Sequence, residues 1–224
     1  MTKADFAALR QNMVDCQLRT VGVTDLAVLT AFLDTPRELF MPASRKVVAY
    51  IDEDVDLGAD ERGNRRFLME PAPLGRLVQL AAVRPEDVVL DVGCGTGYSA
   101  AILARLASAV IALEQDAALN AAASETLAEI GCDNVVTVQG PIADGYASEA
   151  PYDVIFMGGA VDEVPEALFS QLRDGGRLVV VEGHGNAGVA RLYVNNGGRV
   201  AGRTVFNAAV KPLPGLQREP GFVF

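Results

Sequence analysis

The stretch Val88-Val89-Leu90-Asp91-Val92-Gly93-Cys94-Gly95-Thr96-Gly97 determines how the rest of this 224-residue chain is interpreted. Its first five residues form a short β-branched run, which is typical of a strand buried on both faces within a parallel sheet. The glycines that follow let the backbone turn sharply and approach a ligand, because no Cβ stands in the way. We therefore predict a strand, a glycine turn and then a helix over 98–107.

Strands and helices alternate beyond this turn. The pattern predicts strands at 109–113, 135–139, 153–157 and 177–182, with helices at 116–130 and 165–172. Such alternation indicates a doubly wound parallel sheet with right-handed crossovers. Two further runs, 189–194 and 200–206, flank the turn Asn195-Asn196-Gly197-Gly198 and predict an antiparallel hairpin. The expected class is α/β: a doubly wound, seven-stranded, Rossmann-like sheet closed by a carboxyl-terminal hairpin, which resembles the common methyltransferase fold.

The amino-terminal part of the chain has a different pattern. It predicts a helix over 4–20, a helix capped by Thr24 that ends near Pro36, a short helix at 44–51, an exposed loop or hairpin over 52–66, and a helix over 73–83 opened by Pro71 and Pro73. We therefore expect one compact unit with two parts. Residues 1–83 would be a helical addition with the substrate loop, and residues 84–224 the cofactor-binding domain.

Composition excludes several classes of protein. The net charge is −10, whereas nucleic-acid binders usually carry a basic patch. The compact basic cluster Arg62, Arg65 and Arg66 is surrounded by acids, and we expect it to be a solvated loop or an attraction for an acidic acceptor. No apolar run has membrane-spanning length, and the polar segment 1–12 does not resemble a signal peptide. We expect a cytoplasmic protein that binds neither nucleic acid nor membrane; the sequence leaves the oligomeric state open.

Cysteine and histidine are too sparse for a metal centre. Cys16, Cys94 and Cys132 are odd in number and far apart, so they have neither metal-ligand spacing nor a plausible disulfide pattern. His184 is the single histidine, and we interpret it as a structural or surface residue rather than a proton shuttle.

The glycine turn and its flanks indicate the cofactor. Ligands of open α/β sheets bind at the carboxyl ends of the strands. The third glycine comes one residue too early for the dinucleotide fingerprint, and the lysine of a P-loop is absent. The Asp91 carboxylate suits a cationic ligand, and Glu114, at the end of the next strand, suits ribose hydroxyls. Together these features favour S-adenosyl-L-methionine.

The predicted cofactor site extends over four successive loops of the sheet. Glycine and proline near the third strand would lie beside the adenine, and a small residue after the fourth strand would leave room for the acceptor, although both segments also suit ordinary turns or close packing. The predicted residues are Asp91, Gly93, Cys94, Gly95, Thr96, Gly97, Glu114, Gln115, Gly140, Pro141, Ile142 and Gly158.

Several longer motifs resemble the protein-L-isoaspartate O-methyltransferase family over roughly residues 9–215. These motifs are Leu18-Arg19-Thr20-Val21-Gly22-Val23-Thr24-Asp25, Pro36-Arg37-Glu38-Leu39-Phe40, the run from Leu90 to Ala104, and segments 153–155, 164–168 and 172–178. The resemblance implies a small amino-terminal addition over the active site and methylation of the α-carboxylate of isoaspartyl residues in damaged proteins or peptides. The ester would cyclise to a succinimide, whose hydrolysis returns some normal aspartate.

The acceptor half departs from the family pattern of a glycine-rich run followed by Thr-Ile-Ser, a variable residue and proline. Pro71 matches the proline, but Met69 stands in place of the serine and Glu70 follows it. Pro141 replaces the acid of the adenine loop. We predict the substrate site at Met69, Glu70 and Pro71. Three functions stay open: isoaspartyl repair, methyl transfer to a different small-molecule or peptide acceptor, and cofactor binding without catalysis. No catalytic base is expected, because a carboxylate acceptor is already ionised.

Overall fold

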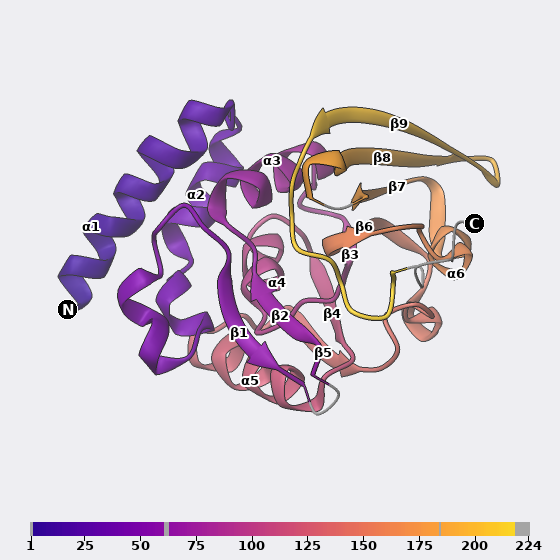
Figure 1. The fold of residues 1–224 in the computed structure, drawn as a ribbon. Coiled ribbons are helices and arrows are strands. Elements are labelled where there is room, and N and C mark those ends of the chain that lie inside the picture. Colours follow the sequence, from indigo (N-terminus) through magenta and orange to yellow (C-terminus); the bar gives the residue numbers. More distant parts are fainter. Residues whose placement is uncertain (1, 61–62, 184, 218–224) are drawn as a thin grey trace, which may run out of the picture.

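The seven-stranded sheet expected from the alternating pattern is present in the computed structural model, which describes residues 2–60, 63–183 and 185–217. The strand order is β5-β4-β3-β6-β7-β8-β9 (Figure 1). Strands β5 to β7 are parallel, and β8 and β9 are added antiparallel at one edge. The strands are β3 (Val88–Val92), β4 (Ala109–Glu114), β5 (Val135–Gln139), β6 (Tyr152–Val161), β7 (Leu172–Glu182), β8 (Val189–Asn196) and β9 (Arg199–Asn207). The predicted fold class is confirmed.

The sheet separates two apolar cores. Alternate residues of a strand point to opposite faces, so Val89 lies in one core and Leu90 in the other. Residues of α3 (Pro71–Ala81), α4 (Tyr98–Ala104) and α5 (Ala117–Glu129) contribute to the first core, and α6 (Glu166–Ser170) contributes to the second. Burial of both faces explains why the central strands read as continuous apolar runs.

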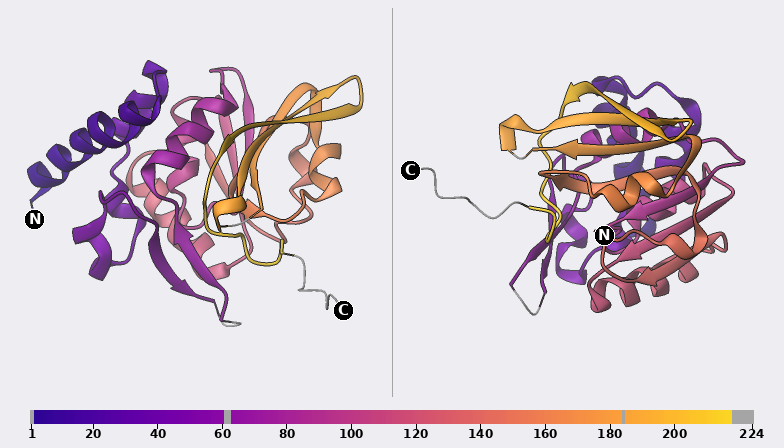
Figure 2. Two further views of the ribbon diagram at one scale, coloured as in Figure 1. Left: turned by 45° about the horizontal axis from the view of Figure 1, so that its top comes forward. Right: turned by 90° about the vertical axis from the view of Figure 1, so that its right-hand side faces the viewer.

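The amino-terminal helices lie at one end of the molecule, beside α3 and α4 (Figures 1 and 2). Helix α1 (Lys3–Met13) continues through a π-helical turn into a short 3-10 helix, so the expected helix over 4–20 is confirmed in outline. The α2 helix (Leu26–Asp34) is capped by Asp25, whose side chain accepts from the backbone N–H groups of residues 27 and 28. The assignment of the cap to Thr24 was therefore wrong by one residue. Two further 3-10 helices, Arg37–Phe40 and Ala43–Val48, follow.

Helix α3 begins two residues earlier than predicted, at Pro71. Proline is well suited to the first turn of a helix, because the N–H it lacks would have no partner there. Consequently Met69 and Glu70 lie directly before the helix. None of the helices in the described part of the chain is long and apolar enough to cross a membrane.

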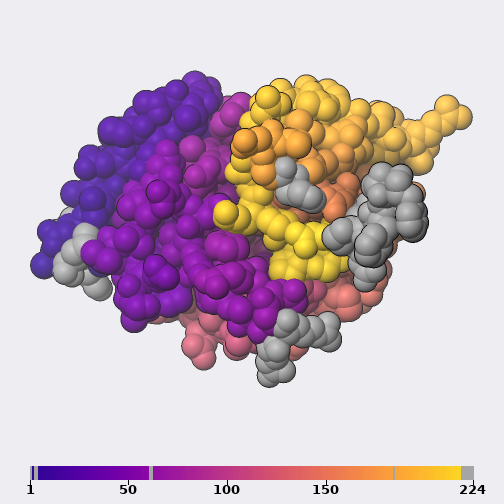
Figure 3. All heavy atoms as spheres, viewed as in Figure 1, coloured from indigo at the N-terminus to yellow at the C-terminus, as the bar shows by residue number. Residues whose placement is uncertain are grey.

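The segment between the two parts of the chain is a hairpin of β1 (Val55–Ala59) and β2 (Arg65–Leu68), forming a separate two-stranded sheet. The expected exposure was wrong for Arg66, whose side chain is only 6% exposed, because it points into the carboxyl edge of the main sheet. The carboxyl-terminal segment runs beside this hairpin across one face of the molecule (Figure 3), where Lys211 Nζ lies 5.4 Å from the centre of the Phe67 ring.

Candidate cofactor and acceptor site

The glycine turn joins β3 to α4 in a tightly packed backbone conformation. Gly93, Gly95 and Gly97 all have positive φ, at 74°, 59° and 93°, a region that favours glycine. A Cβ on Gly93 would lie 2.7 Å from a methyl carbon of Leu213, and a Cβ on Gly158 would lie 2.7 Å from the Gly93 carbonyl oxygen. The strand ends therefore approach one another closely because both positions lack a side chain.

Asp91 lies at the end of β3 with its carboxyl group completely buried. Its Oδ2 accepts a hydrogen bond of 2.6 Å from Ser99 Oγ, whereas Oδ1 has no partner among the described residues. Burial raises the pKa of Asp91 to about 7, and nearby Glu114 adds to the shift. A buried carboxylate oxygen without a partner suits a ligand that carries a positive charge.

Glu114 lies at the end of β4, also completely buried, and its two oxygens are surrounded by donors. The Arg66 guanidinium binds them in a bidentate arrangement at 2.7 and 2.8 Å. Backbone N–H groups of Gly95, Gln115 and Asp116 donate to the same oxygens at 2.8, 3.0 and 3.1 Å. The side chain assigned to the ribose hydroxyls is thus in the expected place, but an arginine holds it.

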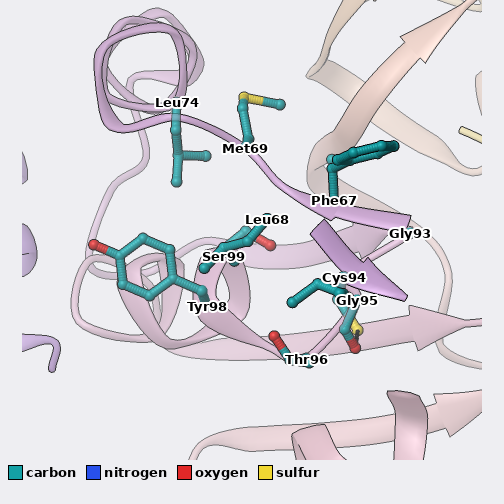
Figure 4. Close-up of a pocket in the computed structure, with 12 residues that line it drawn as sticks. Phe67, Leu68, Met69, Leu74, Gly93, Cys94, Gly95, Thr96, Tyr98 and Ser99 are labelled. Atoms are coloured by element: carbon teal, nitrogen blue, oxygen red, sulfur yellow. Dashed lines mark hydrogen bonds between the residues drawn. The ribbon is translucent and has the colours of Figure 1, made fainter. Parts of the chain in front are cut away.

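Two pockets open along the carboxyl edge of the sheet. The inner pocket (Figure 4) is lined by Leu57, Phe67, Leu68, Met69, Leu74, Gly93, Cys94, Gly95, Thr96, Tyr98, Ser99 and Gly158. The outer pocket is lined by Asp60, Asn64, Gln115, Asp116, Ala117, Ala118, Gln139, Gly140, Pro141 and Gly215.

The Arg66–Glu114 pair stands between these pockets. Arg66 Nη2 also donates to the Gly93 carbonyl oxygen at 3.1 Å, on the inner side. Glu114 accepts from Gln115 and Asp116, which line the outer side. One ion pair therefore lies between two groups of the residues that the sequence predicts to bind the cofactor.

The predicted cofactor residues divide between the two pockets. Gly93, Cys94, Gly95, Thr96 and Gly158 line the inner pocket, and Gln115, Gly140 and Pro141 line the outer one. Four predicted residues line neither pocket: the buried carboxylates Asp91 and Glu114 described above, and Gly97 and Ile142. The Ile142 side chain is buried in the second core, and a Cβ on Gly97 would meet Leu127 of α5.

The predicted acceptor loop, residues 67–71, lies beside the glycine turn at the inner pocket. Figure 4 shows Phe67, Leu68 and Met69 along one segment over Gly93 and Cys94. The Met69 carbonyl accepts from Arg37 Nη2 at 2.8 Å, and Arg37 Nε donates to the Ala49 carbonyl at the same distance. Arg37 is completely buried, and burial lowers the pKa of its guanidinium. The buried Arg37 side chain therefore fixes the main chain at Met69.

Glu70 and Pro71 complete the predicted substrate residues. The Glu70 backbone N–H donates to Asp54 Oδ1 at 3.0 Å, and burial, followed by the charge of Asp54, raises the pKa of the Glu70 carboxyl group. Lys211 lowers it in part. Pro71 is buried at the start of α3. Acidic groups thus lie at the edge of the acceptor loop, with one lysine beside them.

The basic cluster predicted in the hairpin does not act as a unit. Arg65 pairs with Asp56 on the outside of the hairpin, whereas Arg66 points inward to Glu114. Arg62 and His184 lie outside the described residues. The inward arginine was missed because nothing in the pattern separates it from its neighbour; Ser99, the partner of Asp91, lies within the motif that follows the turn but had no role assigned.

The chain is similar to known proteins over almost its whole length. The family model described as Protein-L-isoaspartate(D-aspartate) O-methyltransferase matches residues 9–215. A protein-L-isoaspartate O-methyltransferase of Koribacter versatilis is 35% identical over 212 residues, covering 95% of this chain and 93% of its own. One from Methanoregula boonei is 40% identical over 174 residues, covering 78% of each chain.

Solved structures agree with this match. A protein-L-isoaspartate O-methyltransferase structure superposes with a TM-score of 0.80 at 27% identity, covering 93% of this chain and 67% of its own. A Plasmodium falciparum structure in complex with S-adenosyl-L-homocysteine has a TM-score of 0.75 at 19% identity, covering 93% and 97%. The second likeness concerns the fold alone.

Proposed function

The chain belongs to the protein-L-isoaspartate O-methyltransferase family, and from this premise we propose that its two pockets bind the cofactor and the acceptor of isoaspartyl methylation. It is an S-adenosyl-L-methionine-dependent methyltransferase whose family acts on isoaspartyl sites in proteins. The observation that carries the assignment of the site is the pairing of two buried carboxylates, Asp91 and Glu114, at adjacent strand ends around the glycine turn.

The residues suit this cofactor chemically once Arg66 moves from Glu114. The unpartnered Oδ1 of Asp91 matches the cofactor's ammonium group, and the two oxygens of Glu114 match the two ribose hydroxyls. Gln115, Gly140 and Pro141 at the outer pocket would face the adenine. When bound, S-adenosyl-L-methionine supplies a methyl group on a positively charged sulfur, which is reactive towards a carboxylate oxygen.

The chain's contribution to the reaction is alignment rather than proton transfer. The acceptor carboxylate is ionised at neutral pH, so no residue need accept a proton. Leu57, Phe67, Leu68 and Leu74 exclude water from the inner pocket and so strengthen the electrostatic interactions within it. The fixed loop at Met69 would hold the acceptor oxygen in line with the methyl carbon and sulfur.

We assign the acceptor to the class of isoaspartyl proteins or peptides rather than nucleic acid. The acidic groups Asp54 and Glu70 at the edge of the acceptor loop disfavour a polyanion. Met69 supports a second candidate, methyl transfer to a different small-molecule or peptide acceptor, because a thioether cannot donate a hydrogen bond to an isoaspartyl carboxylate as the family serine does. We also propose a cytoplasmic location, which the free state of Cys16, Cys94 and Cys132 supports.

Radiolabelled methyl transfer tests this proposal. The protein is incubated with labelled S-adenosyl-L-methionine and either an isoaspartyl peptide or its aspartyl twin, and base-labile label is counted. Transfer to the isoaspartyl peptide alone supports the proposal. Binding of S-adenosyl-L-homocysteine without transfer to either peptide favours the second candidate, and no binding at millimolar ligand contradicts the cofactor site.

A further inference from the structure

Arg66 occupies the place where the cofactor's ribose should bind. Its guanidinium takes both oxygens of Glu114, and cofactor binding through the ribose hydroxyls must therefore break this ion pair. The pair is deeply buried, with side-chain exposures of 6% and 0%. Once displaced, an arginine with five donors needs a new anion near the inner pocket.

The inner pocket lacks a side-chain donor for the acceptor carboxylate. Thr96 Oγ1 donates to the Phe40 carbonyl at 2.6 Å, and Ser99 Oγ donates to Asp91 at 2.6 Å. The Tyr98 hydroxyl is completely buried and has no hydrogen-bond partner among the described residues, but it points away from the glycine turn (Figure 4). Among the hydroxyls of the described lining residues, none is both without a partner and directed towards the glycine turn.

The start of α3 has no N–H group at two of its first three positions. Pro71 and Pro73 occupy its first turn, and neither has an N–H group. Lys211 lies near Phe67, but it faces the carboxylates of Asp54 and Glu70, which already offset its charge. The guanidinium of Arg66 is different, because the cofactor would take away its partner.

We propose that Arg66 binds the acceptor carboxylate during the reaction. Before the cofactor binds, the Arg66 guanidinium is paired with Glu114, and the ribose hydroxyls of the cofactor then displace it from the Glu114 oxygens. This inference rests on the proposed function. Arg66 reaches Gly93 of the inner pocket through Nη2 and lies on β2, which ends at Leu68, directly before Met69. A planar guanidinium binds a carboxylate in a bidentate arrangement, so it replaces the hydroxyl that Met69 lacks.

The cofactor thus prepares the site for the acceptor. Before it binds, Arg66 is neutralised by Glu114 and an acidic peptide meets no free cation in the inner pocket. Afterwards the same positive charge is available to the carboxylate that is to be methylated. Arg66 therefore pairs first with the Glu114 carboxylate and then with the acceptor carboxylate, which requires the cofactor to bind before the acceptor.

The test compares Arg66→Gln with Arg66→Lys and Arg65→Gln. Arg65 is the matched control, because it lies next in sequence and pairs with Asp56 on the exposed side. Calorimetry with S-adenosyl-L-homocysteine should show Arg66→Gln binding about fivefold or more tightly than the original protein, since no ion pair is broken. The KM for an isoaspartyl peptide, measured at saturating cofactor, should rise about tenfold or more with little change in kcat. Arg66→Lys should restore most of the KM, and Arg65→Gln should behave as the original protein.

If Arg66→Gln binds S-adenosyl-L-homocysteine with unchanged or lower affinity, the claim that the cofactor displaces Arg66 from Glu114 is wrong. An unchanged KM in a variant that binds this ligand more tightly overturns its role towards the acceptor. The two proposals fail separately. If the original protein transfers no methyl group to the peptide, the proposed function fails, while calorimetry on Arg66→Gln still decides whether arginine and cofactor compete.

Discussion

Replacing Glu114 by glutamine should destabilise the cofactor-free protein strongly. The substitution leaves the Arg66 guanidinium buried without its anion and turns an amide NH₂ group towards the backbone donors of Gly95, Gln115 and Asp116. Removing one partner of a buried ion pair costs about 3–5 kcal/mol. The converse variant, Arg66→Gln, should cost only about 1–2 kcal/mol, because the Glu114 carboxylate keeps its three backbone donors.

Urea unfolding followed by far-ultraviolet circular dichroism measures these values at 25 °C. With a slope of about 2.5 kcal/mol/M, Glu114→Gln should lower the midpoint by about 1–2 M. The double variant Arg66→Gln/Glu114→Gln should be more stable than Glu114→Gln alone, since no charge is stranded. The difference should persist in 0.5 M salt, to which exposed pairs are sensitive. A loss below about 1 kcal/mol for Glu114→Gln, or a double variant no better than the single one, would refute the buried pair.

Three further outcomes are expected. S-adenosyl-L-homocysteine should bind about tenfold more tightly at pH 8 than at pH 6, because the pKa of Asp91 is raised to about 7 and only its ionised form attracts the ligand's ammonium group; calorimetry should show this dependence lost in Asp91→Asn. Gly158→Ala should abolish cofactor binding and cost about 1–3 kcal/mol on urea unfolding, because its Cβ would lie 2.7 Å from the Gly93 carbonyl oxygen. Met69→Ser should raise kcat/KM for an isoaspartyl peptide by about two- to tenfold without changing cofactor affinity, since it adds a donor beside the acceptor; an unchanged kcat/KM would mean that the serine is not what the loop lacks.

The sheet was predictable because each strand carries its own signal. Strand Val88–Val92 and the other central strands are mostly apolar because both of their faces are buried. Glycines with positive φ follow Val88–Val92 and mark its end. Boundaries were less accurate where two residues compete for one role. Thr24 and Asp25 are both good helix caps, and the choice depends on how the preceding turn enters the helix.

The site was predictable where backbone and charge decide it. Asp91 and Glu114 lie at adjacent strand ends, so topology alone brings them together. Arg66 was not predictable, because arginine in an acidic hairpin has the pattern of a solvated residue and its partner is 48 residues away in sequence. The direction of the Ile142 side chain was not predictable for a related reason: its position after β5 was clear, but the pattern does not show that the side chain packs into the second core.

Arg37 has a mechanical consequence for the hairpin. One buried guanidinium binds the carbonyl groups of Ala49 and Met69, which are the two ends of the segment that carries β1 and β2. Both ends of the loop that carries Arg66 are therefore bound to one side chain, so that displacement of Arg66 by a ligand need not move Met69 from its place at the inner pocket.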